Sequence, residues 1–291
     1  MVLGNRFDDR TLRRVQLLIT GILKEFDRLC RELDIPYSVY GGTAIGAIRH
    51  KGFIPWDDDV DVFMRRPDYE RFLKEAPALM DERFRLDSTR TDPEFPYMFA
   101  KLVLKDTLLI PEFAKGASYR MPFFIDVLPL DYIPDDHGVF KAMSRRSWFW
   151  GRLLFLYGTP KPYVLGMSGV RLKLVHSLTS VIHYGLRVAR ISPRKIQAHW
   201  DKAVRRYENA PTGRLADFTM RDPQRWIMSE EEILSPIDVP FEHITVKISS
   251  KYDDMLQRQY GDYMVLPPVE QRWNHDAQII DFGPYEEQWN D

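Results

Sequence analysis

The residues most suited to chemistry are a run of aspartates in FIPWDDDVDVFM, residues 53–64. Asp57, Asp58, Asp59 and Asp61 fall within five positions, between a tryptophan and an apolar run. Carboxylates this close together repel one another, so the segment is either fully solvated or neutralised by a cation. Two or three of them on one side would offer the hard oxygen ligands that Mg²⁺ and Mn²⁺ prefer.

The residues from 59 to 64 have the alternation and β-branched content of a strand, so a strand is predicted there. Residues two apart in a strand point to the same face. Asp57, Asp59 and Asp61 would then share one face, with Asp58 on the other. Because magnesium often shares its ligand shell with substrate phosphates, this arrangement favours phosphate chemistry over a purely structural ion.

A glycine turn precedes the aspartates. Residues 37–40 are predicted to form a short strand that runs into Gly41, Gly42 and Thr43. Glycines allow the backbone to approach phosphate oxygens closely. Thr43 is expected to cap a short helix whose first amides add positive potential.

Other acidic motifs fit less well. The EF-hand pattern requires Gly at its sixth position and Glu at its twelfth, where counting from Asp57 gives Val62 and Asp68. The DDxxD motif of isoprenoid synthases matches formally, but it belongs to a helical fold and has no second copy here. No phosphate-binding G-x-x-x-x-G-K-[ST] loop occurs. The D-x-D of metal-dependent glycosyltransferases matches residues 59–61 and stays open.

The elements around these motifs mix helices and strands. Helices are predicted at 8–33, 67–75 and 249–260, and strands near 84–87, 98–105 and 123–130, with a coil tail at 266–291. This pattern is typical of an α+β or α/β fold. With 291 residues, of which 44% are hydrophobic, the chain can bury a substantial core, and its composition excludes a disordered or fibrous protein.

The formal net charge of −1 hides a basic block, since residues 138–207 hold 14 Lys and Arg and one acid, Asp201. This block is predicted to be helical and contains aromatic residues such as Trp148 and Trp150. One interpretation is a helical subdomain with a solvated basic face. Another is attachment to an anionic membrane surface, which basic and interfacial aromatic side chains both favour. No nucleic-acid-binding motif accompanies the charge, so no nucleic acid is expected as a partner.

The cysteine count and the N-terminus bear on the compartment. Cys30 is the only cysteine, which excludes an intrachain disulfide and a cysteine-based zinc site. The sequence shows neither a secretory signal nor a run of roughly 18 apolar residues that could span a membrane. A cytoplasmic protein is expected, with peripheral attachment at the inner face of the membrane left open.

The stretch YGGTAIGAIRHKGFIPWDDDVDVFM, residues 40–64, resembles the defining motif of the LicD family, which includes bacterial phosphocholine transferases and is related to fukutin. Gly41 and Gly42 match the family's turn, and Asp59 and Asp61 match its D-x-D. FFIDVLPLD, residues 123–131, matches the strand with the third acid, Asp126. The segments FAKLVLKDT (99–107) and YGDYMVLPP with the following Arg and His (260–275) also resemble family segments.

The resemblance implies a fold and a division of the chain. The fold would be α+β: a nucleotidyltransferase (polymerase-β-like) core with a mixed sheet and flanking helices, plus a basic helical insertion. Residues 1–137 would form the catalytic core, 138–210 a basic aromatic helical subdomain, and 211–291 a C-terminal part that completes the core.

The resemblance also implies roles for individual residues. Asp59, Asp61 and Asp126 would be catalytic and would hold Mg²⁺ or Mn²⁺, with Asp57 as a further ligand. The substrate-binding residues would be Gly41, Gly42, Thr43, Arg49, Lys51, Lys101 and His275.

The implied activity is a Mg²⁺-dependent transfer of a phospho-alcohol, such as phosphocholine, from a CDP-linked donor to a hydroxyl of a glycan or lipid-linked glycan. The product would be a modified cell-surface polysaccharide, teichoic acid or lipopolysaccharide. One alternative is a nucleotide-sugar glycosyltransferase that uses the D-x-D. The other is a non-catalytic scaffold that binds glycan or membrane.

Overall fold

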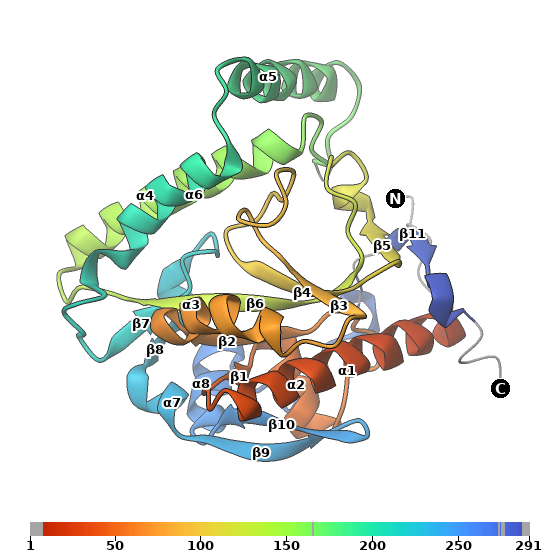
Figure 1. Ribbon diagram of the computed structural model, residues 1–291, viewed down its shortest axis with the longest axis vertical. Coiled ribbons are helices and arrows are strands. Elements are labelled where there is room, and N and C mark those ends of the chain that lie inside the picture. Colours follow the sequence, from red (N-terminus) through yellow and green to blue (C-terminus); the bar gives the residue numbers. More distant parts are fainter. Residues whose placement is uncertain (1–7, 165, 273, 275–276, 287–291) are drawn as a thin grey trace.

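The computed structural model describes residues 8–164, 166–272, 274 and 277–286, and this part of the chain is a mixture of helices and strands (Figure 1). The first half contains α1 (Asp9–Glu32), β1 (Ser38–Val39), α2 (Gly41–Arg49), β2 (Asp61–Arg65), α3 (Arg66–Glu75), β3 (Phe84–Asp87), β4 (Ala100–Leu104), β5 (Leu108–Pro111) and β6 (Phe123–Tyr132). The second half contains α4 (His137–Gly158), α5 (Gly169–Val188), α6 (Pro193–Val204), β7 (Arg214–Ala216), β8 (Ile227–Ser229), α7 (Glu230–Leu234), β9 (Pro236–Phe241), β10 (Ile244–Ser249), α8 (Tyr252–Tyr260) and β11 (Ala277–Asp281).

A seven-stranded sheet lies at the centre of the molecule. Its main order is β1-β2-β6-β4-β3, and β7 and β8 extend it from the end of β6. β2 runs parallel to β6, and the other pairs are antiparallel. Nine of the ten residues of β6 are buried, as expected of a strand that is covered on both faces. Two smaller ribbons, β9 with β10 and β5 with β11, complete the strands of the described residues.

Helix α1 covers one side of the sheet and contacts β4 and β6. Its apolar residues recur every three or four positions, which gathers them on one face. Val15, Ile19, Ile22 and Phe26 on that face have no exposed surface. The helix begins where the carboxylate of Asp8 accepts a hydrogen bond of 2.9 Å from the Thr11 amide.

Helices α4 and α6 form a layer on the opposite side of the sheet from α1, and α5 lies above them, farther from the sheet (Figure 1). A second apolar cluster lies beneath this layer and includes Phe140, Leu154, Ile196 and Trp200. Helix α6 begins at Pro193, directly after Ser192, whose side chain accepts a bond from a first-turn amide. The basic block is therefore helical, as predicted, and it buries part of its aromatic content.

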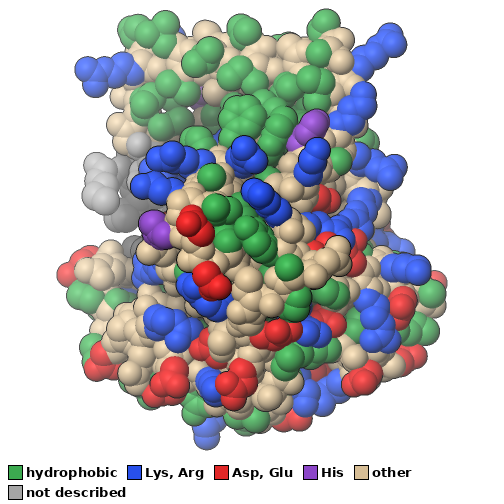
Figure 2. Space-filling view, turned by 90° about the vertical axis from the view of Figure 1, so that its left-hand side faces the viewer, with side chains coloured by type: hydrophobic (Ala, Val, Ile, Leu, Met, Phe, Trp, Pro, Cys, Tyr) green, Lys and Arg blue, Asp and Glu red, His purple; other side chains and the backbone are tan. Residues whose placement is uncertain are grey.

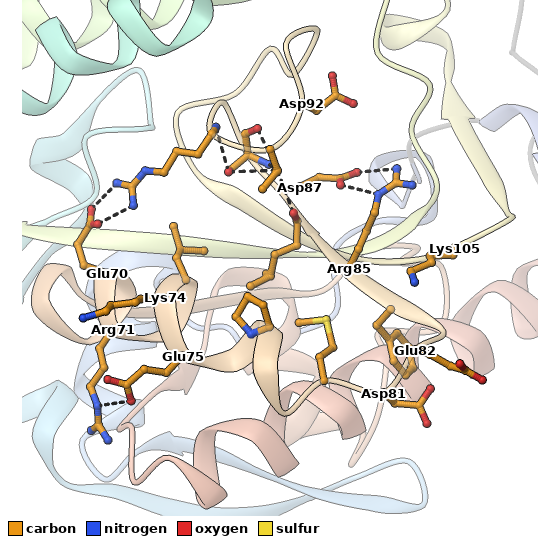
Figure 3. A pocket seen from close by; sticks show the side chains of 18 residues that line it. Glu70, Arg71, Lys74, Glu75, Asp81, Glu82, Arg85, Asp87, Asp92 and Lys105 are labelled. Atoms are coloured by element: carbon orange, nitrogen blue, oxygen red, sulfur yellow. Dashed lines mark hydrogen bonds and ion pairs between the residues drawn. The ribbon is translucent and has the colours of Figure 1, made fainter.

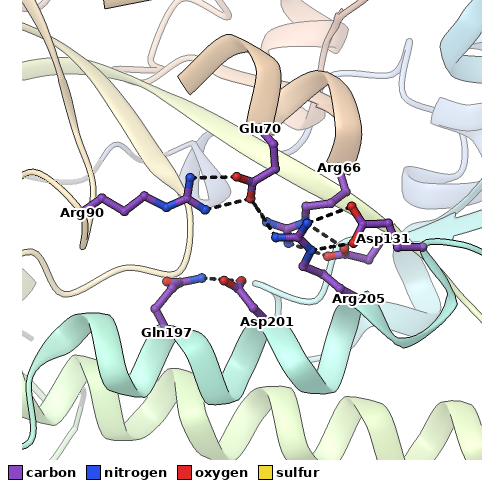
Figure 4. A network of polar contacts seen from close by, with 8 residues as sticks. Arg66, Glu70, Arg90, Asp131, Gln197, Asp201 and Arg205 are labelled. Carbon is purple, nitrogen blue, oxygen red and sulfur yellow. Dashed lines mark hydrogen bonds and ion pairs between the residues drawn. The ribbon is translucent and has the colours of Figure 1, made fainter. Parts of the chain in front are cut away.

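A buried ion pair joins α3 to the sheet next to α6 (Figure 4). Arg66, at the start of α3, donates to both carboxylate oxygens of Asp131 on β6, at 2.8 and 2.6 Å. Each side chain is only 1% exposed. The Arg66 guanidinium also lies 5.2 Å from the ring centre of Trp200 on α6. Glu70 extends the network by accepting a bond from Arg205, which follows α6.

Most of the predicted elements are confirmed, including the long first helix, the helix that Pro67 opens and the strand at 84–87. Two predictions are wrong. The strand expected at 59–64 begins only at Asp61, because the Asp57 amide bonds back to the Ile54 carbonyl and the chain turns there. The tail contains β11, which pairs with β5, instead of coil alone.

The mixed α+β character is thus confirmed. The division into three parts at 137 and 210 stays a prediction.

The buried pair gives the first test. Asp131→Leu leaves the Arg66 charge buried without its partner, so the free energy of unfolding should fall by about 3–5 kcal/mol in urea titrations. The matched control is Arg83→Gln, because the Arg83–Asp81 pair has side chains 57% and 39% exposed. The control should cost less than about 1 kcal/mol. Equal, small losses in both variants would contradict a structural role for the buried pair.

Candidate active site

A cavity of about 300 Å³ lies between the sheet and α4. Its wall combines carboxylates, basic side chains and aromatic rings, which are Asp58, Asp59, Asp126, Lys101, Arg152, Tyr97, Phe99, Phe113, Phe124 and Phe155. A concave, largely apolar site with a few convergent charged groups is the usual form of a small-molecule binding site. The cavity is therefore the candidate active site.

Three charged residues form a row across neighbouring strands at this site. Asp61 on β2 pairs in register with Asp126 on β6, and Asp126 pairs in register with Lys101 on β4. Residues paired across strands point to the same face of a sheet. The Lys101 ammonium bonds to Oδ1 of Asp126, and these side chains are 3% and 16% exposed. The fold therefore brings together residues that are 65 positions apart in the sequence.

The surroundings of the row disfavour the negative charge of Asp61. Burial raises the pKa of Asp61 well above its ordinary value, and the charges of Asp59, Asp126 and Asp57 raise it further, while Lys101 opposes the change. Burial lowers the pKa of Lys101, and Asp126 counteracts this. The site holds more negative than positive charge, which is the condition that a divalent cation relieves.

The glycine turn positions Asp61 and Asp57. Helix α2 begins at Gly41, whose φ of +54° lies in the left-handed region that favours glycine. A β-carbon at Gly42 would lie 2.8 Å from Oδ2 of Asp57, so only glycine fits beneath that carboxylate. The residue that caps α2 is Tyr40, with no side-chain bond. The prediction that Thr43 caps this helix is therefore wrong.

Thr43 instead links the start of α2 to the start of β2. Its hydroxyl oxygen accepts a hydrogen bond of 2.9 Å from the Asp61 amide, and the Asp61 carbonyl accepts one of 2.9 Å from the Tyr40 amide. These bonds fix the start of β2 against the start of α2. Asp61 is thereby placed next to the amides at the N-terminus of α2, where negative groups are favoured.

The expected separation of the aspartates by face is wrong for Asp58. Because the strand begins only at Asp61, residues 57–60 lie before it and alternation does not apply to them. Asp58 is 3% exposed and lines the cavity together with Asp59. Asp57 lies against Gly42.

The predicted metal ligands lie near one another, but their side chains do not converge on one point. Among the residues that the structure describes, no three His, Cys, Asp or Glu side chains are placed so that they could hold one ion. Asp57, Asp59 and Asp126 are all close enough to Asp61 to raise its pKa. The donor set, oxygen-only and strongly anionic, suits Mg²⁺ or Mn²⁺ in its chemistry. The ion and its ligands stay a prediction.

Two of the predicted phosphate-binding cations lie elsewhere. Arg49 donates to the Tyr263 carbonyl at 2.5 Å and to Nε2 of His50 at 2.9 Å, so it holds the segment after α8. Lys51 is exposed in a turn with a φ of +56°. Neither residue lines the cavity, whereas Lys101 does. His275 lies outside the described residues.

The sequence analysis missed the aromatic wall around Lys101. The lysine ammonium lies 4.9 Å from the ring centre of Tyr97, 5.4 Å from that of Phe99 and 3.4 Å from that of Phe124. Aromatic faces attract cations in this range. Residues 97, 99 and 101 alternate as in a strand, which is a signal that could have placed both rings beside the lysine.

A larger, open depression of about 1100 Å³ lies beside α3 and β3 (Figure 3). Six of its charged side chains form three ion pairs: Arg90 with Glu70, Arg71 with Glu75, and Arg85 with Asp87. The lining contains six acidic and five basic residues, so little net charge is available to a ligand. The smaller cavity is therefore the better candidate.

Comparisons with known proteins agree with the motif. Residues 34–106 match the family model described as LicD/FKTN/FKRP, nucleotidyltransferase domain. Over 274 residues, the chain is 31% identical to a Haemophilus influenzae protein named lipopolysaccharide cholinephosphotransferase LicD, covering 92% of this chain and 97% of that protein. The chain belongs to the LicD family. The resemblance inferred from residues 40–64 is thus confirmed.

Shorter similarities lie within other proteins. An uncharacterized protein of Rickettsia typhi is 30% identical over 77 residues, which is 26% of this chain and 25% of that protein. One of Rickettsia prowazekii is 38% identical over 52 residues, or 18% and 20% of the two chains. The matched LicD family region contains Asp59, Asp61 and Lys101 but ends before Asp126, which joins them only through the sheet.

Asp217 is a buried carboxylate near the cavity that the sequence analysis also missed. Its Oδ1 accepts bonds from the amide and the hydroxyl of Thr219, a residue of the cavity wall, at 2.8 and 2.5 Å. Its Oδ2 has no hydrogen-bond partner among the described residues. Burial raises the pKa of Asp217 from 3.8 to about 6.

This pKa predicts a pH-dependent stability. Because the folded-state pKa is raised, the ionised carboxylate destabilises the folded protein. This destabilisation is absent below about pH 4 and complete above about pH 6. Asp217→Asn should therefore unfold in urea with a free energy up to about 3 kcal/mol larger than wild type at pH 7, at roughly 1.4 kcal/mol per pH unit. The difference should vanish near pH 4.

The control is Asp135→Asn, whose side chain is 83% exposed. It should change the free energy of unfolding by less than about 0.5 kcal/mol at either pH. If Asp217→Asn gave the same difference from wild type at pH 4 and pH 7, the titration of Asp217 would not be its cause.

Proposed function

We propose that this protein transfers phosphocholine, or a closely related phospho-alcohol, from a CDP-linked donor to a hydroxyl of a lipopolysaccharide-type glycan and releases CMP. The observation that carries the proposal is the row of Asp61, Asp126 and Lys101, in a chain of the LicD family. Asp126 and Lys101 line an aromatic cavity, and Asp61 lies beside Asp126 on the neighbouring strand. The related Haemophilus influenzae protein is named for this type of transfer.

The arrangement supports a nucleotidyltransferase (polymerase-β-like) core. A Gly-Gly turn follows the first strand and opens α2, the D-x-D leads into β2, and the third acid lies on the adjacent strand β6. The family model that matches residues 34–106 carries the same description.

Asp59, Asp61 and Asp126, with Asp57 beside them, would hold Mg²⁺. Bound there, the ion would neutralise the donor diphosphate and favour in-line displacement. The amides at the start of α2 would add positive potential for the phosphate oxygens.

In the proposed reaction, the acceptor hydroxyl oxygen forms a bond to the phosphorus that carries choline. The bond between that phosphorus and the oxygen bridging to CMP breaks, and CMP leaves with the bonding electron pair. Asp126 accepts the hydroxyl proton. Lys101 holds the Asp126 carboxylate in place and favours its ionised form, which is the form able to take up a proton.

The aromatic wall would bind the trimethylammonium end of the donor. Quaternary ammonium groups are recognised by aromatic faces. The cavity already surrounds one ammonium, that of Lys101, with three rings. Phe113 and Phe155 line the same cavity, and the Phe155 ring already lies 5.4 Å from the Arg152 guanidinium, a second cation at this wall.

The carboxylates give a test of the reaction. Asp59→Asn, Asp61→Asn and Asp126→Asn should each lower CMP release from CDP-choline in the presence of Mg²⁺ by about 100-fold or more, since each would remove several kcal/mol of transition-state stabilisation. Asp135→Asn should retain full activity. Unchanged turnover in the three variants would refute the catalytic assignment, and release of CDP would indicate glycosyl transfer instead.

The aromatic wall gives a separate test of substrate choice. Phe155→Leu should lower kcat/KM for CDP-choline about 3- to 30-fold, because a cation–π contact contributes roughly 0.5–2 kcal/mol. CDP-ethanolamine, whose primary ammonium can bind carboxylates, should be affected less. Phe155→Tyr should preserve the preference for choline. Equal losses with both donors would assign Phe155 to packing.

A further inference from the structure

Helix α5 lies at the outer edge of the molecule, above α4 and α6 (Figure 1). One face of it is anchored. Thr179 donates to the Pro160 carbonyl at 2.8 Å, a ring nitrogen of His183 lies 3.2 Å from the Leu156 carbonyl, and Leu186 is buried. These contacts fix which side of α5 faces outward.

The outward side of α5 is apolar. The exposed residues recur every three or four positions along the helix and therefore form a stripe. They are Val170, Leu174, Leu178, Val181, Tyr184 and Val188, with exposed fractions of 73%, 66%, 63%, 69%, 61% and 84%. Large contiguous apolar patches on a soluble surface mark interaction sites.

The surroundings of this stripe are strongly basic. Residues 138–200 contain 11 Lys and Arg and no Asp or Glu. Arg171 and Lys173 on α5 itself are exposed. Figure 2 shows hydrophobic side chains gathered over the upper edge of the molecule, with Lys and Arg at the ends of this band and below it. An apolar stripe bordered by basic side chains is the pattern of a helix that lies in the plane of a membrane surface.

We propose that α5 docks this protein onto an anionic lipid bilayer, with the stripe in the interface and the basic side chains on the lipid headgroups. Charge decides between this partner and a second copy of the chain. Two copies facing each other through α5 would bring two basic surfaces together, whereas anionic headgroups neutralise them. Helix α5 would lie on the membrane and not cross it, since no helix among the described residues has the length and apolarity of a span.

The location differs from the one that the sequence suggested. Trp150 is partly buried and stacks on His199, with ring centres 4.6 Å apart. Trp148 on α4 is 46% exposed, less than any residue of the α5 stripe. Helix α4 contacts α5 and also contributes Gly151, Arg152 and Phe155 to the cavity wall. The docking surface on α5 is therefore separated from the cavity by one helix, α4.

The experiment is flotation of the full chain with vesicles of phosphatidylcholine alone or mixed with phosphatidylglycerol. The protein should float with the mixed vesicles at low salt and much less with phosphatidylcholine, and added salt should weaken binding. Leu174→Ser with Leu178→Ser should weaken the partition into vesicles about tenfold or more, because two leucine side chains no longer transfer from water into the lipid. Arg171→Gln with Lys173→Gln should weaken it roughly fivefold per charge.

The matched control is Val265→Ser with Val269→Ser, since each of these residues is 65% exposed and lies outside α5. This control should bind like wild type. No flotation of wild type with anionic vesicles overturns the proposal, as does an equal loss in the control. Sedimentation that shows a wild-type dimer and a monomeric Leu174→Ser/Leu178→Ser variant, without vesicle binding, would assign the stripe to a second copy.

Discussion

Repulsion between carboxylates held together in a buried setting is the constraint around which this structure is organised. Asp61 and Asp126 lie side by side on parallel strands, and Asp57 and Asp59 add to the negative charge around them. A carboxylate removed from water strongly favours its neutral form unless a positive charge is nearby. The Lys101 ammonium, bonded to Asp126, supplies part of that charge. The remaining imbalance leaves the candidate site with more negative than positive charge.

Several local features follow from the need to hold these groups in place. The Asp61 amide is bonded to Thr43, and Gly42 leaves room for the Asp57 carboxylate above the start of α2. Lys101 is enclosed by aromatic rings, which stabilise its charge where water cannot. These contacts hold the charged side chains of the candidate site in defined positions.

The helical layer connects the site to its surroundings. The Arg66–Asp131 pair and Trp200 fix α6 against the sheet, and α4 closes the cavity with Phe155. Acidic residues are absent from 138 to 200, while the carboxylates of the site lie on the sheet and the turn before it. The helical region from 138 to 200 is thus basic, and the carboxylates of the candidate site lie on the other side of the cavity.

The sequence by itself determined the elements whose signals are local. The amphipathic spacing of α1, the proline that opens α3 and the glycine turn before the aspartates were all readable, and the motif at 40–64 indicated the family. Only the tertiary structure decided the partners that lie far apart in the chain. The strand register places Asp126 beside Asp61 and Lys101, and β11 finds β5 through backbone bonds that no side-chain pattern encodes. The bond from Arg49 to the Tyr263 carbonyl could not be predicted either, because that carbonyl is a backbone atom more than 200 residues away.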